Sequence, residues 1–262
     1  MKKLLLVSAA FFLVFSCANV IMADMTADEV IAMHLEKTGG IDNYKKVNTV
    51  RMSGKAFIGQ MTADFTVENM APNKFHMKIV SDMFTMETGS DGEQVWQQPP
   101  MVEGFVMTEE EDLPSQLERM VMHPFIDYKD RGVEAKLVGE EQVTGADCYK
   151  IEWVTGAGDT SYIYFDKENF NQVKKVEAES ETMLSKFEEV GGITFPHKMV
   201  QNIGGQRFMM IFNNIETNIE LDSSHFIPPA DSLLAPPEVM EQIKEAQKQQ
   251  QQKQEQQEGQ GE

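Results

Sequence analysis

The ten residues RFMMIFNNIE, positions 207–216, decide the fold class of this chain. Their aromatic and branched side chains are typical of a β-strand, and a strand with one solvated face alternates apolar with polar residues. Here Phe208, Met210 and Phe212 fall on one face, while Met209 and Ile211 fall on the other. Because both faces are apolar, the sheet that contains this strand must be covered on both sides.

The same period of two runs from Val47 onward, and turn signals such as Asp91-Gly92, Gly191-Gly192 and Gly204-Gly205 recur along it. Strands that follow one another through short turns pair in the antiparallel direction. We expect strands at 49–58, 61–69, 74–80, 83–88, 94–97, 135–142, 148–155, 160–166, 172–179, 182–190, 193–203 and 206–220. The fold class predicted is therefore mainly β, with few helices (α+β).

One helix is predicted before the strands. Thr26 and Glu29 form a capping-box pattern, and Gly39-Gly40 supply a left-handed stop. The apolar stripe of this helix needs a sheet to pack on, and it consists of Val30, Ile31, His34 and Leu35.

A second helix is predicted inside TEEEDLPSQLERMVMHPFIDY, residues 108–128. Four acids at 109–112 favour a helix N-terminus, and Leu117, Met120 and Val121 have helical spacing before Pro124. The segment interrupts the strands and divides them into two groups.

Several strands lack a clearly polar face, which predicts a curved sheet that is partly filled by the helices and partly lined by apolar side chains open to a ligand. The side chains expected to line that cavity come from three strand segments. They are Phe75, Met77, Ile79, Phe84, Met86, Phe208, Met210 and Phe212. Methionine is also frequent in the strands, which suits either a surface that repacks around flexible apolar chains or a loosely specified core.

Both ends of the chain differ from the middle. Residues 1–23 have the layout of a secretory signal peptide, with Lys2-Lys3 before the apolar run Leu4 to Phe15. Cleavage after Ala23 is preferred, and lipidation of Cys17 in VFSC is the alternative. We expect one domain at 24–228 and a Pro/Gln-rich tail at 229–262 that is disordered or partly helical. The expected location is the periplasm, or a membrane anchored through Cys17.

Charge and composition exclude several functions. The net charge is −19 and becomes −21 without the two signal lysines, so nucleic acid is not expected as a partner. Cys148 would be the one cysteine of the mature chain, in a half-buried strand, and a disulfide within the chain is not expected. The sequence contains none of the common enzyme motifs, and its histidines are scattered singly: His34, His76, His123, His197 and His225. We therefore expect no catalytic residues, no metal and no cofactor.

Three stretches together resemble the periplasmic outer-membrane lipoprotein carriers, the LolA-like family. They are TADEVIAMHLEKTGG at 26–40, YFDKENFNQVKKVE at 164–177 and FEEVGGITFPHKM at 187–199. The resemblance implies an unclosed antiparallel β-barrel (half-barrel) with a helical lid, whose apolar cavity receives acyl chains. One face of RFMMIF would then line the cavity, and the other would pack on a helix or a neighbouring strand.

Two functions follow. The first is an exported binding protein, expected to be a monomer, that holds the acyl chains of a lipoprotein or another lipid for transport or sorting in the cell envelope. The alternative is a non-catalytic envelope-stress sensor or scaffold that uses the same half-barrel to bind a protein partner.

Overall fold

The computed structural model describes residues 25–98, 104–178 and 180–228. The predicted signal peptide, Cys17 and the Gln-rich tail lie outside these ranges. The helices are α1 (Ala27–Lys37), α2 (Ile41–Lys46) and α3 (Leu113–Arg119), with two 3₁₀ turns, η1 (Tyr128–Arg131) and η2 (Ser223–Phe226). Within the described ranges, no helix combines the length and apolar character needed to cross a membrane.

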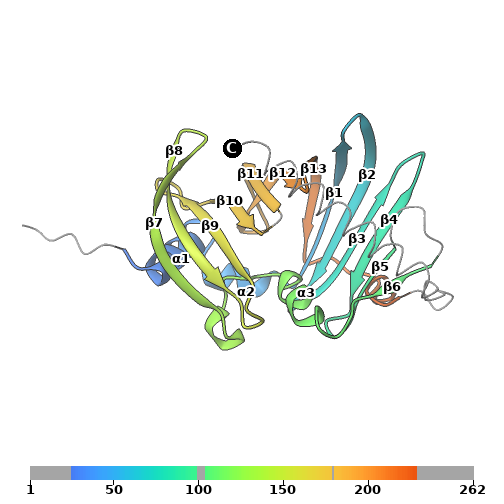
Figure 1. The fold of residues 1–262 in the computed structure, drawn as a ribbon, viewed down its shortest axis with the longest axis horizontal. Coiled ribbons are helices and arrows are strands. Elements are labelled where there is room, and N and C mark those ends of the chain that lie inside the picture. Colours follow the sequence, from blue (N-terminus) through green and yellow to red (C-terminus); the bar gives the residue numbers. More distant parts are fainter. Residues whose placement is uncertain (1–24, 99–103, 179, 229–262) are drawn as a thin grey trace, which may run out of the picture.

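One antiparallel sheet of thirteen strands dominates the fold, and it does not close into a barrel. Its spatial order is β6-β5-β4-β3-β2-β1-β13-β12-β11-β10-β9-β8-β7, so the earliest strands and the strands from the middle of the chain lie at opposite ends of the sheet, and the last strands join them (Figure 1). The strands are β1 (Thr49–Ile58), β2 (Met61–Met70), β3 (Lys74–Val80), β4 (Thr85–Ser90), β5 (Val95–Gln98), β6 (Val106–Met107), β7 (Glu134–Val143), β8 (Ala146–Val154), β9 (Thr160–Asp166), β10 (Gln172–Glu177), β11 (Ser180–Val190), β12 (Ile193–Ile203) and β13 (Gln206–Thr217).

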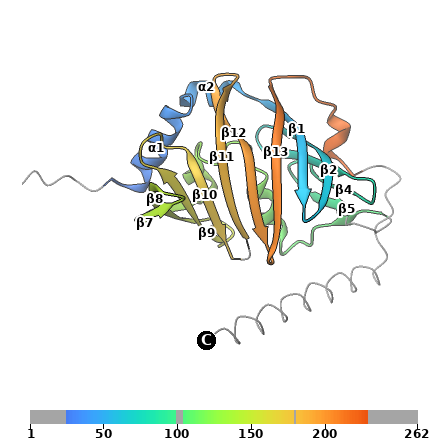
Figure 2. The same ribbon diagram turned by 90° about the horizontal axis from the view of Figure 1, so that it is seen from above.

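The prediction of an unclosed antiparallel half-barrel is confirmed. β10 to β13 form its back, and the walls β7–β9 and β1–β5 face one another across the concave side (Figure 1). The helices α1 and α2 lie along one rim (Figure 2). The curved sheet encloses the space between its two walls. Both walls turn apolar side chains toward that space.

The first helix begins as its capping box predicts. The backbone N–H of Glu29 donates to Thr26 Oγ1 at 3.2 Å, and the Thr26 N–H donates to Glu29 Oε2 at 2.8 Å. Its buried stripe packs with Trp153 of β8 and Phe165 of β9 in one apolar core. A helix of only three turns is stabilised mainly by such packing, because its intrinsic propensity is marginal in water.

A second apolar core fills the concave side of β1, β2, β3 and β13, with Phe65 and Phe212 in edge-to-face contact. A β-bulge shapes this part of the sheet: Ser53 pairs with Asn214 and Gly54 with Phe212, so Asn213 has no partner. The extra residue changes the alternation, and Phe212 and Ile215 are both buried in this core. A Cβ on Gly54 would lie 1.8 Å from the Ile211 carbonyl oxygen, which requires glycine at this site.

Several details differ from the sequence prediction, among them the short strand β6, which was not predicted. The helix α3 begins only at Leu113, and the four acids at 109–112 precede it, because Pro114 fits the first turn of a helix and sets the start there. The short helix α2 at Ile41–Lys46 was not predicted, since six residues are too few for a periodic pattern. β4 begins at Thr85, and Met83 lies in the preceding turn with 73% of its surface exposed.

Candidate functional site

The concave side of the sheet contains an apolar cavity of about 420 Å³. This volume lies in the range of about 300–1,000 Å³ that is typical of small-molecule sites. Its wall combines residues of β1, β2, β3, β10, β11, β12 and β13 with α1, α2, the end of α3 and the segment that follows it. The sheet contributes Val50, Met52, Val67, Asn69, Phe75, Met77, Gln172, Leu184, Phe187, Ile193, Thr194, Phe195, Pro196, Met199, Met210 and Phe212.

The structure brings together half of the side chains that the sequence proposed for this cavity. Four of them, Phe75, Met77, Met210 and Phe212, lie in its wall. The other four are placed elsewhere: Ile79, Phe84 and Met86 belong to the adjoining apolar core, and Phe208 lies half-buried near the start of β13. Whether any of the eight binds a ligand stays a prediction.

Sequence reasoning missed much of the wall, above all Leu184, Phe187 and Phe195 on β11 and β12. Their strands read as mixed polar and apolar, because glutamates such as Glu188 and Glu189 stand beside them. The alternation of Phe187 with Glu188 was the one pattern in the sequence that could have indicated this wall. Such an alternation predicts that one face of the strand is buried, but it does not distinguish a packed core from a cavity wall.

The segment formed by α3 and residues 120–126, which we call the cover segment, crosses the cavity. Residues 119–126 all line it. The cover segment is tied to the opposite rim by two bonds to backbone carbonyls: the N–H of Met122 donates to Pro72 O at 3.0 Å, and His123 Nε2 donates to Val47 O at 2.9 Å. Arg131 holds its far end by donating to the carbonyls of Ile126 and Pro124.

The two histidines and the tyrosine in the wall are held uncharged at neutral pH. Burial lowers the pKa of His34 to about 4, although Nδ1 donates to the Phe170 carbonyl at 2.8 Å, a bond that acts in the opposite direction. Burial likewise lowers the pKa of His123 and raises the pKa of Tyr44. At neutral pH this wall therefore offers neutral rings beside its aliphatic side chains, a surface suited to an apolar ligand.

A second, more polar cavity of about 210 Å³ adjoins the first and shares Arg119, Val121, Pro124, Phe125 and Gln172 with it. Among the residues lining the apolar cavity, Arg119 is the permanently charged one, and its Nε lies 3.9 Å from Glu177 Oε1. Lys175 and Glu177 line the polar cavity. The two spaces together offer one apolar and one polar compartment, side by side.

Cys148 is an unsuitable nucleophile in this structure. Its side chain is fully buried beside Val143 and Tyr164, and burial raises the pKa of its thiol. It lies in a separate small core, because Cys148 alternates with Tyr149 and Ile151, which face α1. The prediction of a strand thiol in a packing role agrees with this position.

The histidines are less scattered in space than in sequence. Glu68, His76 and His225 lie together, with one ligand-type atom of each within 4.8 Å of the others. Within the described ranges, this is the one group of three that could hold a metal ion. It lies outside the apolar cavity, since Glu68 and His76 alternate with the cavity residues Val67 and Met77.

Comparisons with known proteins agree with this architecture. A putative outer membrane lipoprotein-sorting protein domain from Vibrio parahaemolyticus superposes with a TM-score of 0.52 at 9% identity, covering 76% of this chain and 95% of that one. A LolA superfamily protein from Nitrosomonas europaea gives a TM-score of 0.50 at 10% identity, covering 78% and 98% of the two chains.

A DUF1329 family protein from Desulfovibrio piger gives a TM-score of 0.53 at 14% identity, covering 77% of this chain and 97% of that one. Residues 116–232 match the family model described as "Domain of unknown function (DUF4412)". A search of the curated proteins found no match. At these identities the similarity establishes the fold, which is the LolA-like half-barrel that the sequence predicted.

Proposed function

We propose that this protein is a non-catalytic binding protein of the cell envelope that holds the acyl chains of a lipoprotein or another amphiphile in the apolar cavity. The observation that carries the proposal is the apolar cavity beneath the cover segment, with the polar cavity beside it. The predicted signal peptide supports export to the periplasm. One solved protein with the same fold is described as a putative outer membrane lipoprotein-sorting protein domain, which supports the proposal.

The chemistry of the wall fits an acyl chain. Removing one methylene group from water contributes about 0.8 kcal/mol, so a few buried methylenes give measurable affinity without polar recognition. Unbranched Met52, Met77 and Met199 in the wall adapt to chains of different length and bend. The polar cavity around Arg119 and Lys175 would accept the head group, which leaves the tail as the part that is buried.

Binding of a fluorescent acyl-chain probe to delipidated protein tests the proposal. Met77→Gln places an amide in the cavity wall, and Met86→Gln makes the same change at a half-buried position of the adjoining core. We expect wild type and Met86→Gln to bind the probe alike, and Met77→Gln to bind at least about tenfold more weakly, a difference of about 1.4 kcal/mol. Absence of binding by the wild type, or equal loss in both variants, would contradict the proposal.

A second candidate function is binding of a protein partner, and one observation favours it. On the convex side, Met209 pairs across the sheet with Phe57 and Val200, and Val200 pairs with Met183. Side chains of neighbouring strands therefore cover the second face of RFMMIF only in part. The four side chains of this row are each half-buried. A partner that co-purifies with the protein and is lost in Met209→Lys, but kept in Met77→Gln, would support this function over lipid binding.

A further inference from the structure

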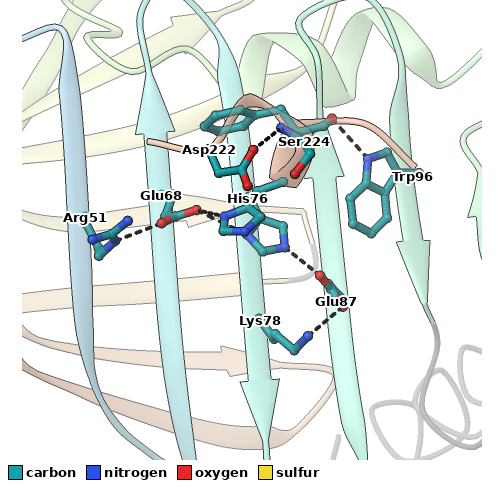
Figure 3. Close-up of polar contacts among 10 residues, drawn as sticks. Arg51, Glu68, His76, Lys78, Glu87, Trp96, Asp222 and Ser224 are labelled. Carbon is teal, nitrogen blue, oxygen red and sulfur yellow. Dashed lines mark hydrogen bonds and ion pairs between the residues drawn. The ribbon is translucent and has the colours of Figure 1, made fainter. Parts of the chain in front are cut away.

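The cluster of Glu68, His76 and His225 lies on the convex side of the sheet, beneath the turn η2. Glu68 belongs to β2 and His76 to β3, where the two residues pair directly across the strands. His225 reaches them from η2, after the last strand, and the next residue, Phe226, is fully buried. Trp96 Nε1 donates to the Phe226 carbonyl at 3.2 Å, which fixes the turn against the sheet (Figure 3).

Three nitrogen and oxygen atoms converge in this cluster. Glu68 Oε2 lies 2.7 Å from His225 Nδ1 and 3.6 Å from His76 Nδ1. The two imidazole rings are 5.3 Å apart between centroids. Glu68 and His76 are 2% and 5% exposed, so two of the three groups are withdrawn from water.

The hydrogen bonds around His76 leave one of its nitrogens free. Its Nε2 donates to Glu87 Oε1 at 2.7 Å, because a carboxylate only accepts (Figure 3). In the neutral ring the lone pair is therefore on Nδ1, which is buried and has no hydrogen-bond partner among the described residues. This lone pair faces the Glu68 carboxylate, and two acceptors that face each other need a cation or a proton between them.

The outer contacts resemble those of a protein metal site. A histidine ligand commonly donates its other N–H to a carboxylate, which orients the ring and raises its basicity, and Glu87 is that carboxylate for His76. Arg51 Nε donates to Glu68 Oε1 at 2.8 Å and leaves Oε2 turned toward the histidines. Lys78 Nζ in turn lies 3.3 Å from Glu87 Oε2. Arg51 and Glu87 thus each hold a ligand residue through the atom that does not face the centre of the cluster, and Lys78 holds Glu87.

We propose that Glu68 Oε2, His76 Nδ1 and His225 Nδ1 form a binding site for a divalent transition-metal ion, with zinc as the best fit. Two imidazoles and a carboxylate are ligands that Zn²⁺ accepts in proteins, at bond lengths of about 2.0–2.2 Å. Four-coordinate geometry at those lengths places ligand atoms about 3.4 Å apart. The Glu68–His76 distance is already close to this value.

His225 must move outward by about 0.7 Å for the same geometry, and its position allows this. Its side chain is 45% exposed and stands on a four-residue turn, unlike the strand residues Glu68 and His76. The proton that Nδ1 now donates to Glu68 would move to Nε2, so the ring binds the ion as the neutral tautomer. Water would complete the coordination on the exposed side. The ion would then clamp η2, and with it the chain leaving β13, onto β2 and β3.

Titration of chelator-treated protein with Zn²⁺ in a calorimeter at neutral pH tests the site. We expect saturable binding of one equivalent and a rise in melting temperature. His225→Ala and Glu68→Gln should each weaken binding at least about 100-fold, and Glu87→Gln, which alters only the supporting carboxylate, about 10–100-fold. His197→Ala removes a histidine from β12, outside the cluster, and should bind zinc like the wild type.

Two results would overturn the proposal. Absence of saturable Zn²⁺ binding by the wild type would mean that protons alone hold the cluster. Equal affinity in wild type, His225→Ala and Glu68→Gln would mean that zinc binds only to the acidic surface. Folding is checked by circular dichroism, and Co²⁺ provides a second readout: a four-coordinate site gives visible d–d absorption, which Glu68→Gln should abolish.

Discussion

Gly39, at the end of α1, lies directly against Gly192, in the turn between β11 and β12. A Cβ on Gly39 would be 2.3 Å from the Gly192 carbonyl oxygen, and the backbone φ of Gly39 is +139°. The next contact along the chain is a hydrogen bond from the Thr194 N–H to the Thr38 carbonyl at 2.8 Å. Gly39-Gly40 and Gly191-Gly192 are about 150 residues apart in the sequence. Together they form the close contact, or joint, between the end of α1 and the sheet.

Substitution of Gly39 tests this joint. Gly39→Ala adds a steric clash with backbone to an unfavourable φ, so we expect a loss of about 3 kcal/mol or more in the free energy of unfolding. Gly40→Ala is the matched control: its φ is +86°, but a Cβ there meets nothing within 4 Å, so only the backbone strain of about 1–2 kcal/mol applies. Urea unfolding of both variants measures the difference, and equal losses would exclude the close contact.

The buried His34 predicts a pH dependence of stability. Its pKa is about 4 in the folded protein against 6.5 in the unfolded chain. Between these values the unfolded state binds one more proton, so stability falls as the pH is lowered from about 6.5 to 4, by about 3 kcal/mol in total. His34→Gln keeps a donor for the Phe170 carbonyl but cannot titrate. Chemical unfolding at pH 7 and pH 4 should therefore show a smaller loss in the variant, and identical losses would contradict the assignment.

Arg131 is expected to hold the end of the cover segment. It donates to the Ile126 carbonyl at 2.9 Å and to the Pro124 carbonyl at 2.5 Å, and it pairs with Glu118 at 3.2 Å. Lysine lacks the planar fork needed for all three contacts, so Arg131→Lys should destabilise the protein by about 1–3 kcal/mol.

Hydrogen exchange locates the effect of that substitution, because amides of the cover segment should exchange faster while those of β8 and β9 stay protected. Arg119→Lys provides the control: the Arg119–Glu177 pair is long, at 3.9 Å, and largely exposed on the arginine side, so a change within about 0.5 kcal/mol is expected. Unchanged exchange in Arg131→Lys would remove Arg131 from this role.

Cys148 should resist thiol reagents while the protein is folded. Its side chain is fully buried, and its raised pKa keeps the thiol protonated at neutral pH. We expect labelling of the mature chain with a chromogenic disulfide reagent to be slow in buffer and rapid in denaturant. Rapid labelling in buffer would show that the core around Val143 and Tyr164 opens readily.

Much of the fold could be read from the sequence, because its signals are local. Alternation and glycine turns placed the long strands within a few residues, as at 49–58 and 193–203, where the predicted bounds are those of β1 and β12. Thr26 and Glu29 fixed the start of α1, since a capping box is completed within four residues. The short elements α2 and β6 escaped prediction, because six and two residues carry no measurable period.

The candidate cavity was only half predictable, for a physical reason. Phe208 and Phe212 occupy equivalent positions in the alternation of one strand, but the structure places Phe212 in the cavity wall and Phe208 outside it. An inward-facing position can belong to a filled core or to an open space, and the curvature of the sheet decides between them. That curvature depends on features such as the β-bulge opposite Gly54. This bulge lies between β1 and β13, two strands that are far apart in the sequence.

The sequence by itself determined that this chain forms a large antiparallel sheet with apolar side chains on both faces of its last strand, since these properties depend on neighbouring residues. Only the tertiary structure decided which side chains meet across the half-barrel and beneath η2. Glu68 and His225 are 157 residues apart and touch because β13 returns beside β1 and sends η2 over β3. Contacts of this kind are fixed by strand order and register, to which no local pattern of residues corresponds.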